Sequence, residues 1–256
     1  MKQLWIELGK KCLLSVAIYA ALFIVLYLVE RFVPALQGRL LRWDSAAFIV
    51  GIPASVIGTA YVLTIKNPNN YLGFYLGIIM SLLLAVQFYL QAQYEFVVLY
   101  ALVFTTFMIR SIITWRKAAQ ATDAEPLAPS FVSRKYLIIN ICFFLIVALL
   151  DYIFATYVND GGAWGCNVWI KIAGAASLSS SIFANFWLMY KANDAWIFWV
   201  IYSVSGMVLF ALLGNIFSFV LFTMFLIING TAQVSWLKMT TPENNGWTAS
   251  VKPRKK

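Results

Sequence analysis

The chain has 256 residues, of which 62% are hydrophobic and 11% are charged, and its mean hydropathy is +0.80. Soluble domains carry roughly 45–50% apolar and about 25% charged residues, so this composition excludes a water-soluble globular protein. The net charge of +9 lies in short loops and at the C-terminus. That placement is typical of topology signals and does not indicate nucleic-acid binding.

Long apolar runs, and not the alternating strands of an outer-membrane barrel, predict an all-α, polytopic membrane protein. Eight runs are long enough to cross about 30 Å of hydrocarbon as helices. They are expected at residues 11–29, 46–65, 70–88, 95–115, 136–157, 166–189, 195–213 and 216–237, the last two forming a hairpin broken at Gly214-Asn215.

Basic residues mark one side of the membrane. They precede the first run and follow the second, fourth, sixth and eighth, whereas the intervening loops hold only Arg31, Arg39 and Arg42. The positive-inside rule therefore predicts that both termini are cytoplasmic. The first run follows Lys10 and Lys11 as a signal peptide would, but it is longer than the usual roughly 7–15 residues and no clear cleavage site follows. We expect an uncleaved N-terminal transmembrane helix and loop at residues 1–45.

The remainder of the chain contains an internal repeat. The stretch from Lys66 to Tyr71 aligns with the stretch from Lys191 to Trp196, so that a basic residue, a polar turn and an aromatic residue coincide. After this stretch each half continues with two apolar runs, and it ends in Trp-Arg-Lys in one case and Trp-Leu-Lys in the other. The plan predicts a first three-helix repeat at 46–116, a linker and connecting helix at 117–157, a second repeat at 158–240 and a basic cytoplasmic tail at 241–256.

A single span between the two triplets makes the repeats parallel, related by an axis along the membrane normal. A transport path would run along that axis. The expected fold is thus one extra N-terminal helix followed by a core of three, one and three helices.

Groups for catalysis are missing from the sequence. It has no histidine, and its acidic residues fall mainly in loops or near the ends of spans. Triad, general-base and metal chemistry all need such groups in a constellation, so we expect no enzyme, no catalytic or metal site and no cofactor. Proton-driven carriers usually place acidic or histidine side chains at membrane depth, so passive transport is expected.

Uncharged polar and aromatic residues recur along several spans instead. Ser177, Ser181 and Asn185 follow i+4 spacing, and interhelical hydrogen bonds are the structural alternative for such a stripe. Amides supply donors and acceptors, and Trp or Tyr faces stack on flat rings, which suits a neutral or cationic ring compound bearing hydroxyls. The predicted substrate-binding residues, near the midplane between the triplets, are Trp199, Trp196, Tyr202, Asn185, Asn229, Gln233, Gln87 and Tyr75.

Other features receive structural interpretations. Trp115 and Trp236, close to span ends, are interpreted as anchors at the membrane interface. Lys171 is expected to reach the interface with its amine, with pairing to Asp151 as the alternative. Gly73 begins a Gly-x-x-x-Gly stretch that predicts close helix packing.

Two motifs in the second half of the chain resemble those of the PnuC family of vitamin transporters. They are Trp196-Ile-Phe-Trp199 after a polar turn and Asn229-Gly230 late in the last span, and the stretch from Lys66 to Gly73 resembles a turn in the family's first half. The likeness covers roughly residues 45–240. The resemblance implies a SWEET-like homo-oligomer that passes nicotinamide riboside, a vitamin B3 precursor for NAD synthesis, through the inner membrane of a bacterium by facilitated diffusion. Phosphorylation inside would trap the product.

The expected partners are thus a small-molecule substrate and the lipid bilayer. Related transporters with similar motifs carry thiamine or riboflavin, and these substrates remain alternatives. A membrane scaffold or assembly protein without substrate is the alternative from another class. It would leave the polar stripes and the internal repeat unexplained.

Overall fold

The computed structural model describes residues 2–38, 40–41, 45–91, 94–120, 129, 131–132, 134–157, 167–212 and 216–239. Every regular element in these ranges is a helix, as the apolar runs predicted. The elements are α1 (Lys2–Phe32), a short 3-10 turn (Pro34–Leu36), α2 (Ala46–Ile65), α3 (Gly73–Leu90), α4 (Tyr94–Val98), a π-helical segment (Leu99–Phe104), α5 (Thr105–Gln120), α6 (Arg134–Tyr157), α7 (Val168–Met189), α8 (Ala195–Leu212) and α9 (Ile216–Met239). The Gly214-Asn215 break, most of the linker and the basic tail lie outside the described residues.

The described helices have the length and composition of membrane spans. Seven of them are apolar enough to cross a bilayer, with α4, the π-helical segment and α5 forming one continuous span. In α6 the apolar part is Ile138–Phe154. α1 is much longer than the predicted run of residues 11–29, because a helix can continue past its apolar stretch into the polar interface.

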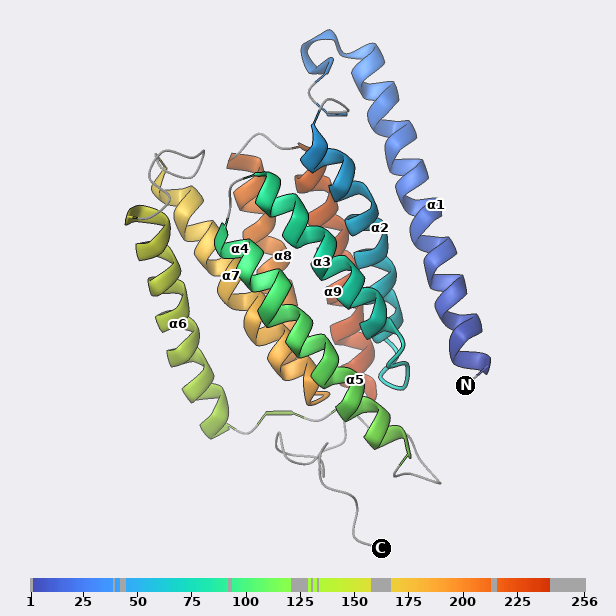
Figure 1. The fold of residues 1–256 in the computed structure, drawn as a ribbon, viewed down its shortest axis with the longest axis vertical. Coiled ribbons are helices and arrows are strands. Elements are labelled where there is room, and N and C mark those ends of the chain that lie inside the picture. Colours follow the sequence, from blue (N-terminus) through green and yellow to red (C-terminus); the bar gives the residue numbers. More distant parts are fainter. Residues whose placement is uncertain are drawn as a thin grey trace, which may run out of the picture.

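Six helices form a closed ring. α2 packs on α3 and α3 on α5, and in the same order α7 packs on α8 and α8 on α9. The ring closes through two seams, where α5 contacts α7 and α9 contacts α2. Figure 1 shows the two triplets side by side, with α1 and α6 on opposite flanks. Each seam therefore joins the third helix of one repeat to the first helix of the other.

The flanking helices occupy matching places. α1 packs on α2, the first helix of repeat one, and α6 packs on α7, the first helix of repeat two. Polar contacts fix α1 along its length: the Ser15 hydroxyl donates to the Val56 carbonyl oxygen (2.6 Å), and Tyr19 shares a hydrogen bond with Thr59 (3.1 Å). Near its N-terminus Glu7 accepts hydrogen bonds from asparagines of the α2–α3 turn. The extra helix of the prediction is thus the counterpart of the connecting helix.

The start of α1 and the C-terminal ends of α2, α5, α7 and α9 lie at one end of the molecule, called here the terminal end. The opposite, distal end holds the starts of α2 and α9 and the end of α3. Because α2 and α7 both run from the distal to the terminal end, the repeats are parallel.

The two tryptophans interpreted as interface anchors are instead buried in the bundle. Trp115 is 1% exposed and Trp236 is 0% exposed. Their rings pack on other aromatic rings at the terminal end, because helix ends from both repeats converge there. The Lys171 amine donates to the hydroxyl of Thr156 on α6 (3.3 Å) and not to Asp151, and its reach to the membrane interface stays a prediction.

The polar stripe on α7 bonds mostly to its own helix. The Ser181 hydroxyl donates to the Leu178 carbonyl oxygen (2.7 Å), and the Asn185 amide nitrogen donates to the Ser181 carbonyl oxygen (2.9 Å). Interhelical bonding is therefore the wrong explanation for these two donors. Back-bonding of this kind satisfies a donor without a partner helix, which leaves the face free to border an interior space.

Candidate functional site

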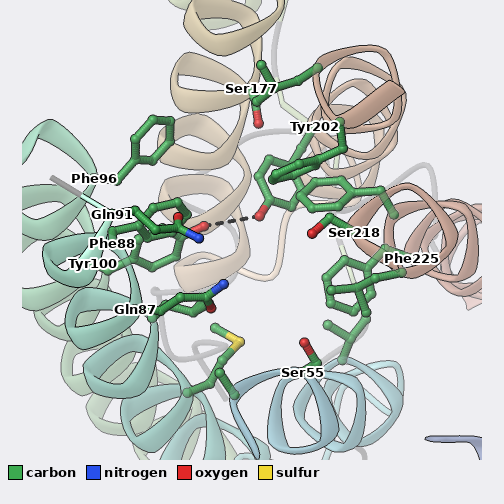
Figure 2. A pocket seen from close by; sticks show the side chains of 18 of the residues that line it. Ser55, Gln87, Phe88, Gln91, Phe96, Tyr100, Ser177, Tyr202, Ser218 and Phe225 are labelled. Carbon is green, nitrogen blue, oxygen red and sulfur yellow. Dashed lines mark hydrogen bonds between the residues drawn. The ribbon is translucent and has the colours of Figure 1, made fainter. Parts of the chain in front are cut away.

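A cavity of about 370 Å³ lies inside the ring of six helices. Its lining begins at Leu40 and Ser45 near the distal end and reaches Tyr61, Trp199 and Asn229 in the interior. Figure 2 shows Gln87, Gln91 and Tyr100 across the cavity from Tyr202, Ser218 and Phe225. The volume is within the roughly 300–1,000 Å³ that is common for small-molecule sites.

Four of the residues predicted from the sequence line this cavity: Trp199, Tyr202, Asn229 and Gln87. Trp199 and Tyr202 come from α8, Asn229 from α9 and Gln87 from α3, so both repeats contribute. Helical spacing put the first two on one face of α8, and the ring of helices turns that face inward. The Trp199 and Tyr202 rings meet edge to face, with centroids 5.3 Å apart.

The other four predicted residues lie elsewhere. Tyr75 is 44% exposed on the outer face of α3, so we remove it from the candidate site. Trp196, Asn185 and Gln233 are not part of the lining; Trp196 packs edge to face on Trp236 with centroids 5.4 Å apart. On their helices these three lie closer to the terminal end than the lining residues Trp199, Ser177 and Asn229.

The Asn229 side chain has its amide nitrogen hydrogen-bonded and its amide oxygen unpaired. Its amide nitrogen donates to the Ser203 hydroxyl oxygen (3.0 Å) and to the Trp199 carbonyl oxygen (3.3 Å). Ser203 in turn donates to the same carbonyl oxygen (2.8 Å). The Asn229 side-chain oxygen has no partner. The network therefore orients the amide so that it presents an acceptor at the cavity wall.

Several other interior polar atoms also lack a hydrogen-bond partner. They include the indole nitrogen of Trp199, the side-chain oxygen of Gln233 and the hydroxyl of Tyr61. Buried polar groups are normally paired, and an unpaired group costs about 1–3 kcal/mol. A polar solute or water that entered this region would find both donors, such as the Trp199 indole N–H and the Tyr61 hydroxyl, and acceptors, such as the Gln233 side-chain oxygen.

The sequence reasoning missed Tyr100 and the aromatic wall beside it. Tyr100 shares a hydrogen bond with Tyr202 (3.1 Å), which links the two repeats across the cavity (Figure 2). Its ring stacks on Phe88 at 5.3 Å, and Phe88 stacks on Phe96 at 4.8 Å. Tyr100 lies in the π-helical segment, and such segments often occur at functional sites. The extra residue in the turn changes which side chains face inward, and no spacing rule signalled that change.

The cavity lining carries no charged side chain among the described residues. It consists of aromatic and aliphatic groups with hydroxyls from serine and tyrosine and the amides of Gln87, Gln91 and Asn229. Across the described parts of the chain no cluster of three potential metal-binding side chains occurs. The chemistry that this site offers is hydrogen bonding and ring stacking.

A helical membrane protein with a polar and aromatic cavity between two parallel repeats has the architecture of a solute transporter. Residues 48–238 match the family described as nicotinamide mononucleotide transporter, and the chain belongs to that family. The match begins in α2 and ends in α9, so it includes both repeats and leaves α1 outside. The chain is therefore a multi-pass membrane transporter.

The fold is similar to that of a solved protein described as the vitamin B3 transporter PnuC. The two chains are 18% identical, the similarity covers 89% of each, and the TM-score is 0.61. Comparison with curated protein sequences finds no match.

Proposed function

We propose that this chain carries nicotinamide riboside through the membrane by facilitated diffusion. The observation that carries the proposal is the uncharged cavity between the repeats, whose lining combines amides, hydroxyls and aromatic rings. Nicotinamide riboside has a cationic pyridinium ring, a carboxamide and ribose hydroxyls. Aromatic faces attract a cationic ring, and amide and hydroxyl groups pair with the rest of the molecule.

The missing charge favours the riboside over the mononucleotide. A phosphate group carries about −1.5 to −2 charges at neutral pH and needs basic partners when it is buried. No lysine or arginine is among the described lining residues. A mononucleotide in this cavity would bury its phosphate without a basic partner. The riboside has no phosphate, so it places no anionic group in the cavity.

Each proposed contact has a physical role. Trp199 stacks on the pyridinium ring and offers its free indole N–H, while the Asn229 side-chain oxygen accepts from a hydroxyl or from the carboxamide. Gln87 reaches the substrate from the first repeat. Trp196, Asn185 and Gln233, toward the terminal end, are proposed to meet the substrate when the cavity extends in that direction.

Transport is proposed to be uncoupled, because no acidic or basic group lines the described cavity. We place the protein in a bacterial inner membrane as a homo-oligomer with the terminal end in the cytoplasm. The positions of the basic loops support that orientation. Exposed apolar side chains along α1 and α6 supply surface for lipid or for neighbouring subunits.

Ligand-dependent thermal stabilisation in detergent tests the substrate. A ligand at 100 times its dissociation constant stabilises the folded state by about 2.7 kcal/mol, which corresponds to roughly 5–10 °C for a chain of this size. Nicotinamide riboside is expected to give this shift and nicotinamide mononucleotide little or none. A larger shift with thiamine or riboflavin would identify that vitamin as the substrate instead. No shift with any vitamin or nucleoside would favour a scaffold protein without a substrate.

Variants then test the site. Trp199→Ala and Asn229→Ala, at two residues that line the cavity, are expected to lose substrate binding while the purified protein stays folded and keeps its oligomeric state. Trp169→Ala is the matched control, because Trp169 is 64% exposed at the start of α7. If both site variants bound the substrate as tightly as the parent, the pocket assignment would be wrong. Loss of fold or assembly would instead indicate a packing role.

A further inference from the structure

Two tryptophans at matching positions of the repeats close the seams at the terminal end. Trp115, at the end of α5, donates its indole N–H to the Leu188 carbonyl oxygen at the end of α7 (3.1 Å). Trp236, at the end of α9, donates its indole N–H to the Lys66 carbonyl oxygen at the end of α2 (2.7 Å). Each repeat therefore supplies one donor and one acceptor to the other, and each seam has one such bond.

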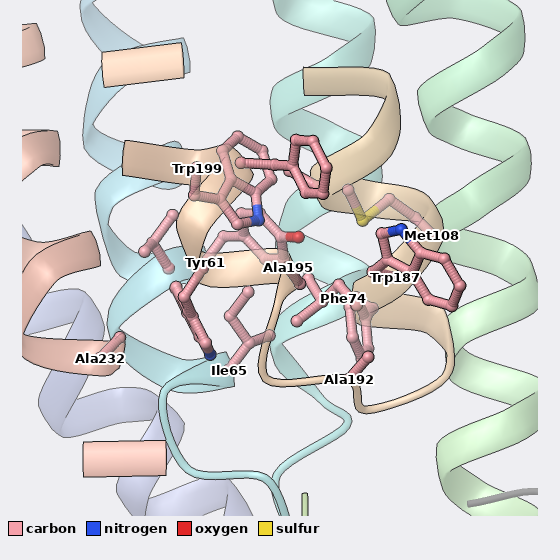
Figure 3. Packing of buried hydrophobic residues seen from close by; sticks show 14 of the residues in the cluster. Tyr61, Ile65, Phe74, Met108, Trp187, Ala192, Ala195, Trp199 and Ala232 are labelled. Carbon is pink, nitrogen blue, oxygen red and sulfur yellow. The ribbon is translucent and has the colours of Figure 1, made fainter. Parts of the chain in front are cut away.

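The two rings belong to one buried aromatic layer. Trp115 and Trp236 lie with centroids 5.9 Å apart, Phe74 meets Trp115 edge to face at 4.7 Å, and Trp196 meets Trp236 at 5.4 Å. None of these four residues lines the cavity, whose lining stops nearer the molecule's centre. Figure 3 shows the neighbouring part of this core, with Phe74 below Trp199. The layer separates the cavity from the terminal end.

The acceptors are suited to a reversible contact. The last carbonyl groups of a helix lack partners within that helix, so they accept from a side chain, from the following turn or from water. The Leu188 carbonyl oxygen accepts from the backbone N–H of Lys191 (3.0 Å) as well as from the Trp115 indole. When the helix ends separate, water can replace the indole at each carbonyl, and the indole N–H can also be hydrated. The hydrogen bonds thus hold the helix ends together in the closed state. On opening, hydrogen bonds to water replace them, so no buried polar group is left unpaired.

Lys191 contacts the same layer from the α7–α8 turn. Its amine lies 4.8 Å from the centre of a Trp115 ring, which is a cation–π contact. The residue is 3% exposed, and its backbone adopts a left-handed conformation with φ of 55°. That conformation is uncommon for a lysine and directs the turn back over the aromatic layer.

We propose that Trp115 and Trp236 are the paired latches of a gate at the terminal end. In the structure the cavity extends toward the distal end and the latches are closed. To open the cavity toward the terminal end, both seams must separate there. The same two repeats form both seams, so this movement breaks both indole hydrogen bonds together. The proposal rests on the transport function and adds the residues that determine which end is closed.

The test measures access to the cavity from each side. In a background with Cys12, Cys142 and Cys166 replaced by serine, Ser177→Cys places a reporter thiol in the cavity wall. A membrane-impermeant maleimide is applied to vesicles of either orientation. Trp115→Phe and Trp236→Phe keep an aromatic ring and remove the donor, and Trp169→Phe is the matched control on an exposed tryptophan.

The ratio of terminal-side to distal-side labelling is expected to rise about two- to tenfold for each donor removed, and further in the double variant. Trp169→Phe is expected to leave the ratio unchanged. An unchanged ratio in folded, monodisperse Trp variants overturns the proposal. If the double variant fails to fold, the single variants carry the same test.

Labelling requires no substrate, so its result is separate from that of the binding experiments. A chain that binds a different solute can still show the gate. Conversely, if the protein bound nicotinamide riboside but the labelling ratio did not change in the Trp variants, the proposed function would stand and the latch proposal would be rejected.

Discussion

Lys191 is a buried cation in the turn between α7 and α8, outside the membrane-spanning helices. Burial lowers the pKa of its amine from the ordinary 10.5 to about 8. The amine lies over the Trp115 ring, which attracts a cation but solvates the ammonium group less well than water does. The charged form therefore carries a penalty in the folded protein at neutral pH.

This penalty gives a pH dependence with a definite sign. Between about pH 8 and 10.5 the unfolded chain keeps a proton that the folded chain has lost, so the free energy of unfolding rises with pH in that window. Relative to Lys191→Met, the parent is expected to gain up to about 3 kcal/mol from pH 7 to 10.5. Thermal unfolding of both proteins across this range measures the difference. Parallel curves would contradict the lowered pKa.

We expect Ser203 to act as a positioning residue, because it holds the Asn229 amide without lining the cavity. Ser203→Ala is expected to weaken substrate binding roughly fivefold, since a hydrogen bond of about 1 kcal/mol no longer orients that amide. Ser205→Ala is the matched control on the same helix, because its hydroxyl bonds only to carbonyl oxygens of α8 in the contacts described. Isothermal titration with the two variants makes the comparison. Equal affinities would remove the positioning role.

At the scale of elements, close approach of α8 and α9 depends on a glycine. A methyl group added at Gly206 would overlap the Phe222 ring, and Phe222 lines the cavity. Gly206→Ala is expected to destabilise the protein by about 1–3 kcal/mol and to weaken substrate binding, because the ring must move. Gly230 on α9 has open space around it, so Gly230→Ala is the control. It is expected to leave binding unchanged and to raise stability by up to about 1 kcal/mol.

Glycine packing in the first repeat was predictable from the sequence. A methyl group at Gly77 would meet Met108 at 2.8 Å and the Tyr61 ring at 3.2 Å, so the Gly-x-x-x-Gly stretch does allow close packing. The π-helical segment Leu99–Phe104 was not predictable, because its residues are as apolar as those of an ordinary span. Only the packing of α3 and α7 against it shows which side Tyr100 faces.

At the scale of the whole molecule, the orientation remains a prediction. Basic residues in alternate loops favour a cytoplasmic terminal end, so a C-terminal reporter that is active only in the cytoplasm is expected to give signal. A reporter active only outside the cytoplasm serves as the control and is expected to stay silent. Signal from the second reporter would reverse the proposed topology.

Uncoupled transport is also a property of the whole molecule. In liposomes without a trapping enzyme, substrate is expected to equilibrate and not to accumulate, whether or not a proton or sodium gradient is imposed. The physical reason is that no Asp, Glu, His, Lys or Arg side chain is among the described lining residues to link transport to a gradient. Accumulation above the external level under either gradient would show coupling.

The sequence by itself determined the helices, the repeat and the residue types that line the candidate site. Apolar runs fixed the spans because a helix must satisfy its backbone within the bilayer, and helical spacing placed Trp199 and Tyr202 on one face. The resemblance in those motifs agrees with the family found for residues 48–238. Tertiary structure decided which polar residues meet: it turned Tyr75 outward, buried Trp115 and Trp236 at the seams and brought Tyr100 to Tyr202. Periodicity defines faces of single helices, whereas these contacts depend on how the helices rotate and pack in the closed ring.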